Sequence, residues 1–256
     1  MLSVHLAVIG LVRNFSTCLP QILELYWKKI SDNRVLNSTI SFHLSQTERP
    51  LQNPRSREFT LPENNAEILL ENYSHSIFDL DKIRDDSSSL FQKLLLKGEW
   101  LGGEGRNLRN YVEAMWLQKM AFEELQKVEA DTFIFCRPDI YPVTALRTTP
   151  WLWMGTAFVL TPHWGQYGGT NDRFAIIPRE YLERYLCRIE RSLEYINQVG
   201  PLFPERFLKW TLIGTRHLPI LHHDGIRIRS GGIPNRRDLE RTGFQNLGPW
   251  NVSVGL

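Results

Sequence analysis

One stretch of the sequence joins a buried strand to charged residues: Thr132-Phe133-Ile134-Phe135-Cys136-Arg137-Pro138-Asp139-Ile140-Tyr141. Its first four residues favour extended backbone, and Arg137 and Asp139 follow where the strand ends. Charged side chains are unfavourable within a buried central strand, whereas ligands bind outside the carboxyl ends of strands in open α/β sheets. Because a carboxylate can hold a metal and a guanidinium can hold a phosphate, the stretch predicts an enzyme that handles a phosphorylated donor.

Strand-like and helix-like patterns alternate outward from this stretch. The apolar runs Val4–Val12 and Ser38–Leu44 predict strands, and the long helical pattern Arg106–Val128 leads directly into Thr132. Further helices are expected at Ala66–Tyr73, Leu90–Leu96, Tyr181–Ile196 and Glu205–Ile213, and a further strand at Trp151–Leu160. This order predicts an α/β fold with a mostly parallel central sheet, helices on both faces and a mixed C-terminal part.

A first helix is expected directly after the first strand. Ser16 or Thr17 can cap it, and Pro20 suits its first turn. Its apolar face would comprise Ile22, Leu23, Tyr26 and Ile30.

The composition is that of an ordinary globular protein, with 42% hydrophobic and 23% charged residues among 256. A formal net charge of +2 argues against a partner that is nucleic acid, because such binders carry a pervasive basic field. Three cysteines, Cys18, Cys136 and Cys187, are too few and too scattered for a disulfide framework or a zinc cluster. They are typical of reduced, mostly buried thiols in a cytosol-like compartment.

The sequence has no run that predicts a transmembrane segment. The apolar run Leu6–Val12 is too short to span a bilayer, and it lacks the basic region and cleavage site of a signal peptide. We therefore expect a cytoplasmic protein.

Arg13 and Asn14 directly follow the first strand, where a doubly wound sheet has its ligand crevice. Arg13 could meet a diphosphate or a nucleobase there, or it could be a solvated turn residue. The sequence contains neither G-x-G-x-x-G after this strand nor G-x-x-x-x-G-K-[ST] anywhere. The absence of these two common phosphate-binding fingerprints disfavours both a dinucleotide dehydrogenase and a P-loop enzyme.

Arg106 and Arg109 begin the long helix, where cations are unfavourable unless something compensates. A bound anion would compensate, and so would solvent exposure beside Glu104 or Glu113. The neighbouring amides of Asn107 and Asn110 could hydrogen-bond a base or sugar. The glycines 102, 103 and 105 just before this helix are interpreted as a flexible loop rather than a phosphate cradle.

Three carboxylates are candidates for chemistry. Asp139 could be a metal ligand, or a turn carboxylate paired with Arg137. Asn171 and Asp172 follow two glycines and offer an amide and a carboxylate that could bind the acceptor, and Asp172 could also act as a general base or cap a turn. Glu205 after Pro204 is a second base candidate, or simply a first-turn helix carboxylate.

The C-terminal half adds weaker candidates. His222 in His222-His223-Asp224 could ligate a metal, although adjacent strand residues point to opposite faces. Trp164 and Tyr167 could stack on an acceptor sugar or belong to the core. An arginine-rich tail could close over a pyrophosphate leaving group or be solvated surface; its members are Arg216, Arg227, Arg229, Arg236, Arg237 and Arg241.

Assembled, these features resemble the GT-A-type nucleotide-sugar glycosyltransferases, particularly small WavE-like polysaccharide and lipopolysaccharide transferases and related viral or algal enzymes. Five short motifs carry the resemblance and cover most of the chain: Gly10-Leu11-Val12-Arg13-Asn14-Phe15, Arg106-Asn107-Leu108-Arg109-Asn110-Tyr111, Phe135-Cys136-Arg137-Pro138-Asp139-Ile140, Asn171-Asp172-Arg173-Phe174 and Pro204-Glu205-Arg206-Phe207-Leu208.

The resemblance implies a single GT-A-like Rossmann-type domain over residues 1–256, with a nucleotide-binding half at 1–145 and an acceptor-binding half at 146–256. It implies transfer of a sugar from a nucleoside diphosphate sugar, with a UDP-sugar favoured, to a hydroxyl of a glycan acceptor. Asp139 would stand at the last Asp of the family's D-x-D motif and hold Mn²⁺ or Mg²⁺. Arg137 replaces the first Asp, which leaves metal dependence open because an arginine can itself neutralise phosphate.

By the same resemblance, Arg13 and Arg109 would bind the nucleotide, and Asp172, or failing that Glu205, would be the base of an inverting enzyme. Two other readings stay open. A nucleotidyl- or sulfotransferase is disfavoured by the missing phosphate-binding loop. A non-catalytic carbohydrate-binding or degenerate transferase module would use the Trp and Tyr surface without turnover.

Overall fold

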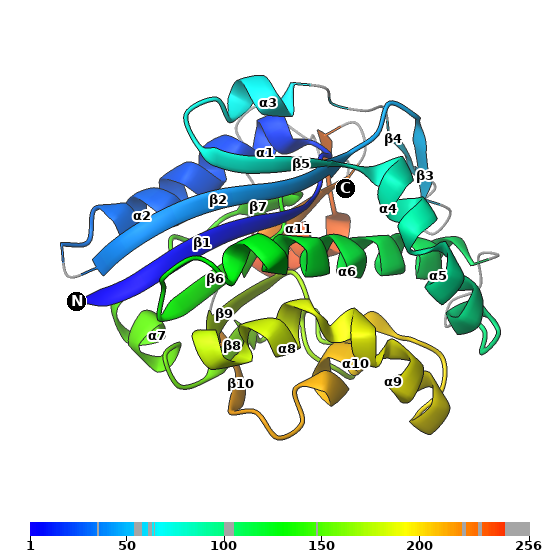
Figure 1. Cartoon of the computed structure of the whole chain (residues 1–256). Helices are drawn as coiled ribbons and strands as arrows, with labels where there is room; N and C mark the ends of the chain where they lie inside the picture. The colour runs from blue at the N-terminus through cyan, green and yellow to red at the C-terminus, as the bar shows by residue number, and fades with distance from the viewer. Residues whose placement is uncertain are drawn as a thin grey trace.

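The computed structural model describes residues 1–34, 36–53, 58–60, 63, 65–99, 105–146, 148–221, 224–229 and 232–243 (Figure 1). Within this part of the chain, a seven-stranded sheet has the order β10-β8-β9-β6-β1-β2-β5. Its strands are β1 (Leu2–Leu11), β2 (Leu36–Gln46), β5 (Ser74–Asp79), β6 (Thr132–Cys136), β8 (Val159–Pro162), β9 (Phe174–Pro178) and β10 (His217–Leu221). All but β9 run in one direction, which confirms the prediction of a mostly parallel α/β sheet.

Alternation along β1 sends its apolar side chains to two separate cores. Leu6 and Val8 pack with α1 (Phe15–Ile22) and the π-helical turn and α2 (Lys28–Ser31) that continue it. Ala7 and Ile9 pack with α6 (Arg106–Leu125) on the other side. Figure 1 shows α1 and α2 on one side of the strands and α6 running along the other, so the prediction of helices on both faces is confirmed.

Shorter elements complete the described structure. The remaining α-helices are α3 (Ala66–Leu69), α4 (Leu80–Asp86), α5 (Ser88–Leu95), α7 (Thr148–Met154), α8 (Leu182–Leu186), α9 (Ser192–Gln198), α10 (Pro204–Thr211) and α11 (Arg236–Thr242). A small sheet joins β7 (Ile140–Pro142), β11 (Gly225–Arg229) and β12 (Ile233–Pro234), and β3 (Leu51–Asn53) pairs with β4 (Glu58–Thr60).

Several sequence-based boundaries were wrong. The predicted strand over Trp151–Leu160 is the helix α7 followed by β8, because Pro150 fits an early helical turn and Gly155 follows the last one. The predicted helix over Tyr181–Ile196 is broken into α8, α9 and 3₁₀ turns. Strand β5 and helix α11 were not predicted at all.

The first helix begins at Phe15, before both of the predicted cap residues. Asn14 occupies the cap position with φ 52°, and Ser16 and Thr17 lie inside the helix. The carboxylate of Glu63, distant in sequence, accepts hydrogen bonds from the backbone N–H groups of Phe15 at 3.0 Å and Ser16 at 3.2 Å. A tertiary contact therefore satisfies the orphan donors that a local cap was expected to satisfy.

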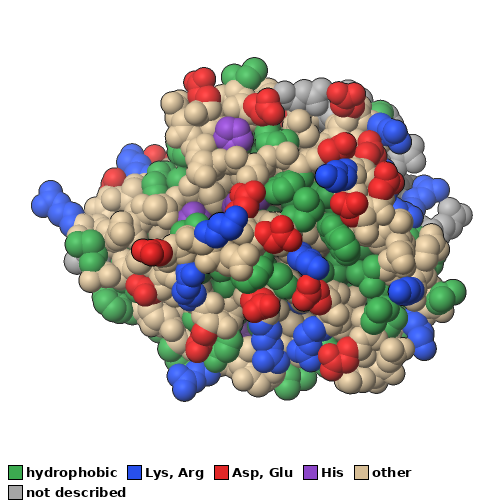
Figure 2. Space-filling view, viewed as in Figure 1, with side chains coloured by type: hydrophobic (Ala, Val, Ile, Leu, Met, Phe, Trp, Pro, Cys, Tyr) green, Lys and Arg blue, Asp and Glu red, His purple; other side chains and the backbone are tan. Residues whose placement is uncertain are grey.

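The described cysteines are unpaired and buried, as predicted for Cys18, Cys136 and Cys187. On the face shown in Figure 2, acidic and basic side chains are interspersed rather than gathered into a field of one sign. No described helix has the length and apolarity needed to cross a membrane.

Candidate functional site

A cleft of about 270 Å³ lies outside the carboxyl ends of β1, β2 and the loop after β6. Ile9, Gly10 and Leu11 of β1 form its floor together with Ser45 of β2. Its polar lining includes Arg13, Asn107, Asn110, Glu113, Gln118, Arg137, Asp139, Asp172, Arg173, Glu205, Arg227 and Arg229. Parallel strands bring their carboxyl ends to one edge, so residues more than 200 positions apart meet there, such as Arg13 and Arg229.

Arg13, Arg137 and Asp139 form one ion-paired cluster at this edge, called here the arginine–aspartate cluster. Arg137 donates from Nε to Asp139 Oδ1 at 2.9 Å and from Nη2 to Oδ2 at 2.7 Å. Arg13 donates from Nη2 to the same Oδ2. Burial alone would raise the pKa of Asp139, but the charges of Arg137 and Arg13 outweigh it and hold that pKa well below its ordinary value.

A glycine lets the loop after β6 approach β1 closely enough to build this cluster. A Cβ on Gly10 would lie 2.5 Å from Cδ of Pro138, closer than carbon atoms pack. Since Pro138 separates Arg137 from Asp139, its contact with Gly10 brings both side chains next to Arg13 at the end of β1.

Asp172 and Glu205 form a second charged group, the carboxylate pair, around Arg173. Arg173 donates from Nη2 to Glu205 Oε1 at 3.1 Å, and its Nη1 lies 3.5 Å from Asp172 Oδ1. Asp172 and Arg173 directly precede β9, whereas Glu205 lies in the first turn of α10. All three are buried, and Asp172 Oδ1 accepts no hydrogen bond within the described chain.

The proton affinity of Glu205 is raised by its surroundings. Burial raises the pKa of Glu205, the negative charge of Asp172 raises it further, and Arg173 offsets these effects only in part. A carboxylate with a raised pKa in a cleft is a typical general base or acid.

Some residues predicted to bind ligand are used elsewhere. Asn14 donates from Nδ2 to the carbonyl of Arg229 at 2.8 Å and accepts from the N–H of Gly232 at 3.1 Å, so it ties α1 to the end of β11. The Arg109 guanidinium lies over the Phe91 ring, 3.9 Å from its centroid, and neither Arg109 nor the exposed Arg106 lines the cleft.

The predicted acceptor residues also lie outside the cleft lining. Asn171 is fully buried, donates to the carbonyl of Trp164 at 2.7 Å and accepts from the N–H of Arg173 at 2.9 Å. Trp164 is only 6% exposed, and the guanidinium of Arg241 covers its ring at 4.0 Å. Tyr167 remains 42% exposed, with φ 42°.

Two predictions fall outside the described residues. These are His222 as a metal ligand and the glycine loop at 102 and 103. Gly105 is described, and with φ 82° it occupies the cap position of α6.

Two members of the predicted arginine-rich tail line the cleft, and a further buried arginine that the sequence did not indicate lies behind it. Arg227 and Arg229 stand two apart on β11, so both reach the cleft, and Arg227 is held by Asp238 at 2.7 and 3.0 Å. Behind the cleft, Arg188 is 1% exposed and donates to Gln118 Oε1 at 2.6 Å. Alternation of arginines along 227–229 was the available signal; nothing in the sequence pointed to Arg188.

The residues around Asp139 do not fit a divalent cation as they stand. Both of its carboxylate oxygens already accept hydrogen bonds from guanidinium groups. In the described part of the chain, no group of three or more His, Cys, Asp or Glu side chains could hold a metal ion.

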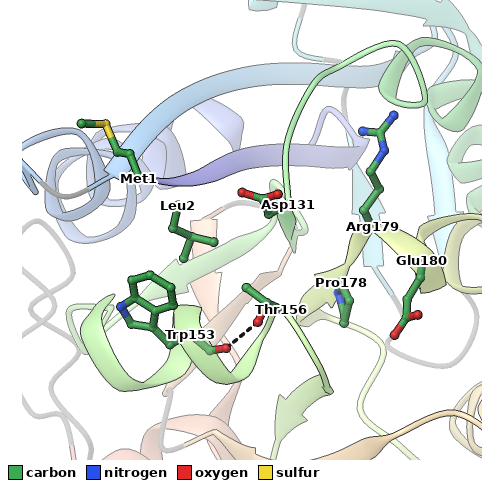
Figure 3. Close-up of a pocket in the computed structure, with 8 residues that line it drawn as sticks. All are labelled: Met1, Leu2, Asp131, Trp153, Thr156, Pro178, Arg179 and Glu180. Carbon is green, nitrogen blue, oxygen red and sulfur yellow. Dashed lines mark hydrogen bonds between the residues drawn. The ribbon is translucent and has the colours of Figure 1, made fainter.

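A second hollow, of about 500 Å³, lies at the other end of the sheet, around the start of β1 (Figure 3). At this hollow, the Asp131 carboxylate accepts a hydrogen bond from the N–H of Ser3, and the Asp131 backbone carbonyl accepts one from the N–H of Arg179. The Thr156 hydroxyl donates to the carbonyl of Trp153 at 2.9 Å. No described residue predicted to bind donor, acceptor or metal lines this hollow.

Comparison with known proteins gives little. No family model matches the chain, and no curated protein matches it. Among solved structures, the apo form of mouse xyloside xylosyltransferase 1 is similar, with 12% identity, a TM-score of 0.41, and coverage of 83% of this chain and 82% of that chain. A likeness at this level carries no information on activity, so the function must be argued from the cleft.

Proposed function

We propose that the chain is a glycosyltransferase that moves a sugar from a nucleoside diphosphate sugar to a hydroxyl of a glycan acceptor. The observation that carries the proposal is the composition of one cleft. Arginines that suit a diphosphate and a buried carboxylate pair that suits a hydroxyl proton both line it. In transfer from a phosphorylated donor to an alcohol, the first group can stabilise the leaving phosphate and the second can take the hydroxyl proton.

The donor side is supported by position and charge. Arg13 and Arg137 lie at the carboxyl ends of β1 and β6, where open α/β sheets bind nucleotides. Guanidinium groups bind phosphate oxygens in pairs and stay charged at any physiological pH. Arg229 lines the same cleft and adds to its positive charge.

The acceptor side is supported by the carboxylate pair. In the proposed step, an acceptor hydroxyl attacks the anomeric carbon while the bond from that carbon to the diphosphate oxygen breaks. The hydroxyl proton passes to Asp172, or else to Glu205, and the diphosphate leaves with the bonding electrons. Arginine charge stabilises that leaving group as its negative charge grows.

A carbohydrate-binding module without turnover is less well supported. Such a module needs an open aromatic face for a sugar ring. Trp164 is buried beneath Arg241, and Tyr167, although exposed, does not line the cleft. A binding module without turnover also gives no reason for a carboxylate pair and an arginine–aspartate cluster to share one cleft.

The test is a transfer assay with the full chain and a panel of nucleotide sugars, UDP-sugars first, that detects released nucleoside diphosphate. Asp172→Asn is expected to lower the rate by about 10²–10⁴-fold, the range for loss of a general base. Glu194→Gln, an exposed carboxylate on α9, is the matched control and should leave the rate unchanged. Activity that persists in the double variant Asp172→Asn, Glu205→Gln would contradict the assigned base.

A further inference from the structure

We propose that Arg13 and Arg137 neutralise the donor diphosphate without a divalent cation, and that Asp139 is a positioning residue that holds the two guanidinium groups. This inference rests on the proposed function, because it concerns how the same cleft binds the diphosphate. It departs from the expectation that Asp139 itself carries Mn²⁺ or Mg²⁺.

The first argument is the state of Asp139. A hard cation needs a carboxylate oxygen that faces it. Both oxygens of Asp139 face guanidinium groups, with Arg137 bonded to each oxygen and Arg13 to one. The Asp139 side chain is 5% exposed, so a cation would have to displace a buried, charge-assisted pair before it could bind.

The second argument is the rest of the lining. Four carboxylates line the described cleft, and each of them faces an arginine. Arg173 serves both members of the carboxylate pair, and Arg84 donates to Glu113 at 2.8 Å. The carboxylates that line the described cleft are therefore already paired with guanidinium groups, which leaves no cluster of negative charge there that would attract a divalent ion.

The third argument is the balance of charge. The arginine–aspartate cluster carries two positive charges and one negative charge, so it keeps a net positive charge that a diphosphate can meet. The Arg137 side chain is 33% exposed and lies on the cleft wall, within reach of an incoming ligand. A guanidinium whose orientation is already fixed loses less entropy when it binds a phosphate.

The experiment measures affinities of UDP, GDP, CDP and ADP for the full chain by isothermal titration, in EDTA and again in MnCl₂ and in MgCl₂. We expect one nucleoside diphosphate to bind in EDTA with a Kd within about threefold of its value in either metal. Arg137→Ala should weaken that binding at least tenfold in EDTA, and Arg137→Lys should restore part of it. Arg34→Ala removes an equal charge from an exposed side chain before the start of β2, at the opposite end of that strand from the cleft, and it should change nothing.

Asp139→Asn separates positioning from metal ligation. A positioning role predicts the same loss of affinity in EDTA and in MnCl₂, whereas a ligand role predicts a loss seen only in MnCl₂. Circular dichroism and thermal unfolding of each variant show that it is folded. Binding that requires Mn²⁺ or Mg²⁺ overturns this inference but leaves the proposed function standing; no binding under any condition overturns both.

Discussion

Gly169 lies directly against the backbone of Glu205. A Cβ placed on Gly169 would come within 2.0 Å of both the carbonyl carbon and the carbonyl oxygen of Glu205. The next residue, Thr170, donates its N–H to that same carbonyl oxygen at 2.8 Å. This contact joins the first turn of α10 to the segment that carries Asp172, so it brings the two members of the carboxylate pair together.

Gly169→Ala is therefore expected to disrupt both stability and activity. Backbone atoms would have to move, and the free energy of unfolding should fall by about 1–3 kcal/mol, the cost of overpacking with a backbone shift. Urea unfolding measures this loss. Gly169 does not have a positive φ, so the loss reports the contact with Glu205 and not a left-handed backbone. An unfolding free energy equal to that of the wild type would show that the contact has no role.

The pKa of Glu205 should depend on its neighbour Asp172. Burial and the charge of Asp172 raise the pKa of Glu205. In Asp172→Asn that charge is gone, so the pKa of Glu205 should be lower in the variant than in the wild type. Carboxyl NMR titration of both proteins, with Glu205→Gln to assign the signal, tests this. An unchanged or higher pKa of Glu205 in Asp172→Asn would contradict it.

Stability should also depend on pH through a buried histidine on β1. His5 contacts Thr39 Oγ1 and Ser41 Oγ, each at 2.7 Å. Burial, helped by His43, lowers the pKa of His5 from its ordinary 6.5 to about 4. Between these values the unfolded chain binds more protons than the folded one, so the free energy of unfolding falls as the pH drops from 6.5 to 4.

The loss attributable to His5 is on the order of 3 kcal/mol at full extent. Urea unfolding at pH 7, 5.5 and 4.5 measures it. His5→Gln should flatten the slope, whereas His75→Gln, at an exposed position of β5, should leave it as in the wild type. A slope unchanged in His5→Gln would rule out this assignment.

The buried guanidinium of Arg188 should matter more than any surface arginine. It donates from Nη1 to Gln118 Oε1 at 2.6 Å and to the carbonyl of Tyr185 at 2.7 Å. Arg188→Met leaves both acceptors unsatisfied, and we expect a loss of about 2–4 kcal/mol in unfolding free energy. Activity should fall as well, because Gln118 lines the cleft. Arg236→Met, which breaks only an exposed pair with Glu240, should cost less than about 1 kcal/mol.

The fold was predictable where a local pattern agreed with burial. The apolar run at the start of the chain and Thr132–Cys136 are both central strands, and Arg106–Leu125 is a helix as its pattern indicated. The pattern failed at Trp151–Met154, because aromatic residues favour strands only when neighbouring strands are there to pack against. The pattern also missed β5, because that edge strand is only partly buried and so has no continuous apolar run.

The sequence by itself determined which charged residues follow the strands and therefore reach the ligand edge: Arg13, Arg137 and Asp139. That follows from chain direction, which a strand pattern and its flanking residues define locally. The pairing of Asp139 with Arg137 could also be expected from the sequence, but only the tertiary structure decided the other contacts. The pairing of Asp139 with Arg13, the closure of Glu205 onto Gly169 and the burial of Trp164 beneath Arg241 each join residues more than thirty positions apart. No local pattern encodes such distances, because they are set by how the sheet and its helices pack.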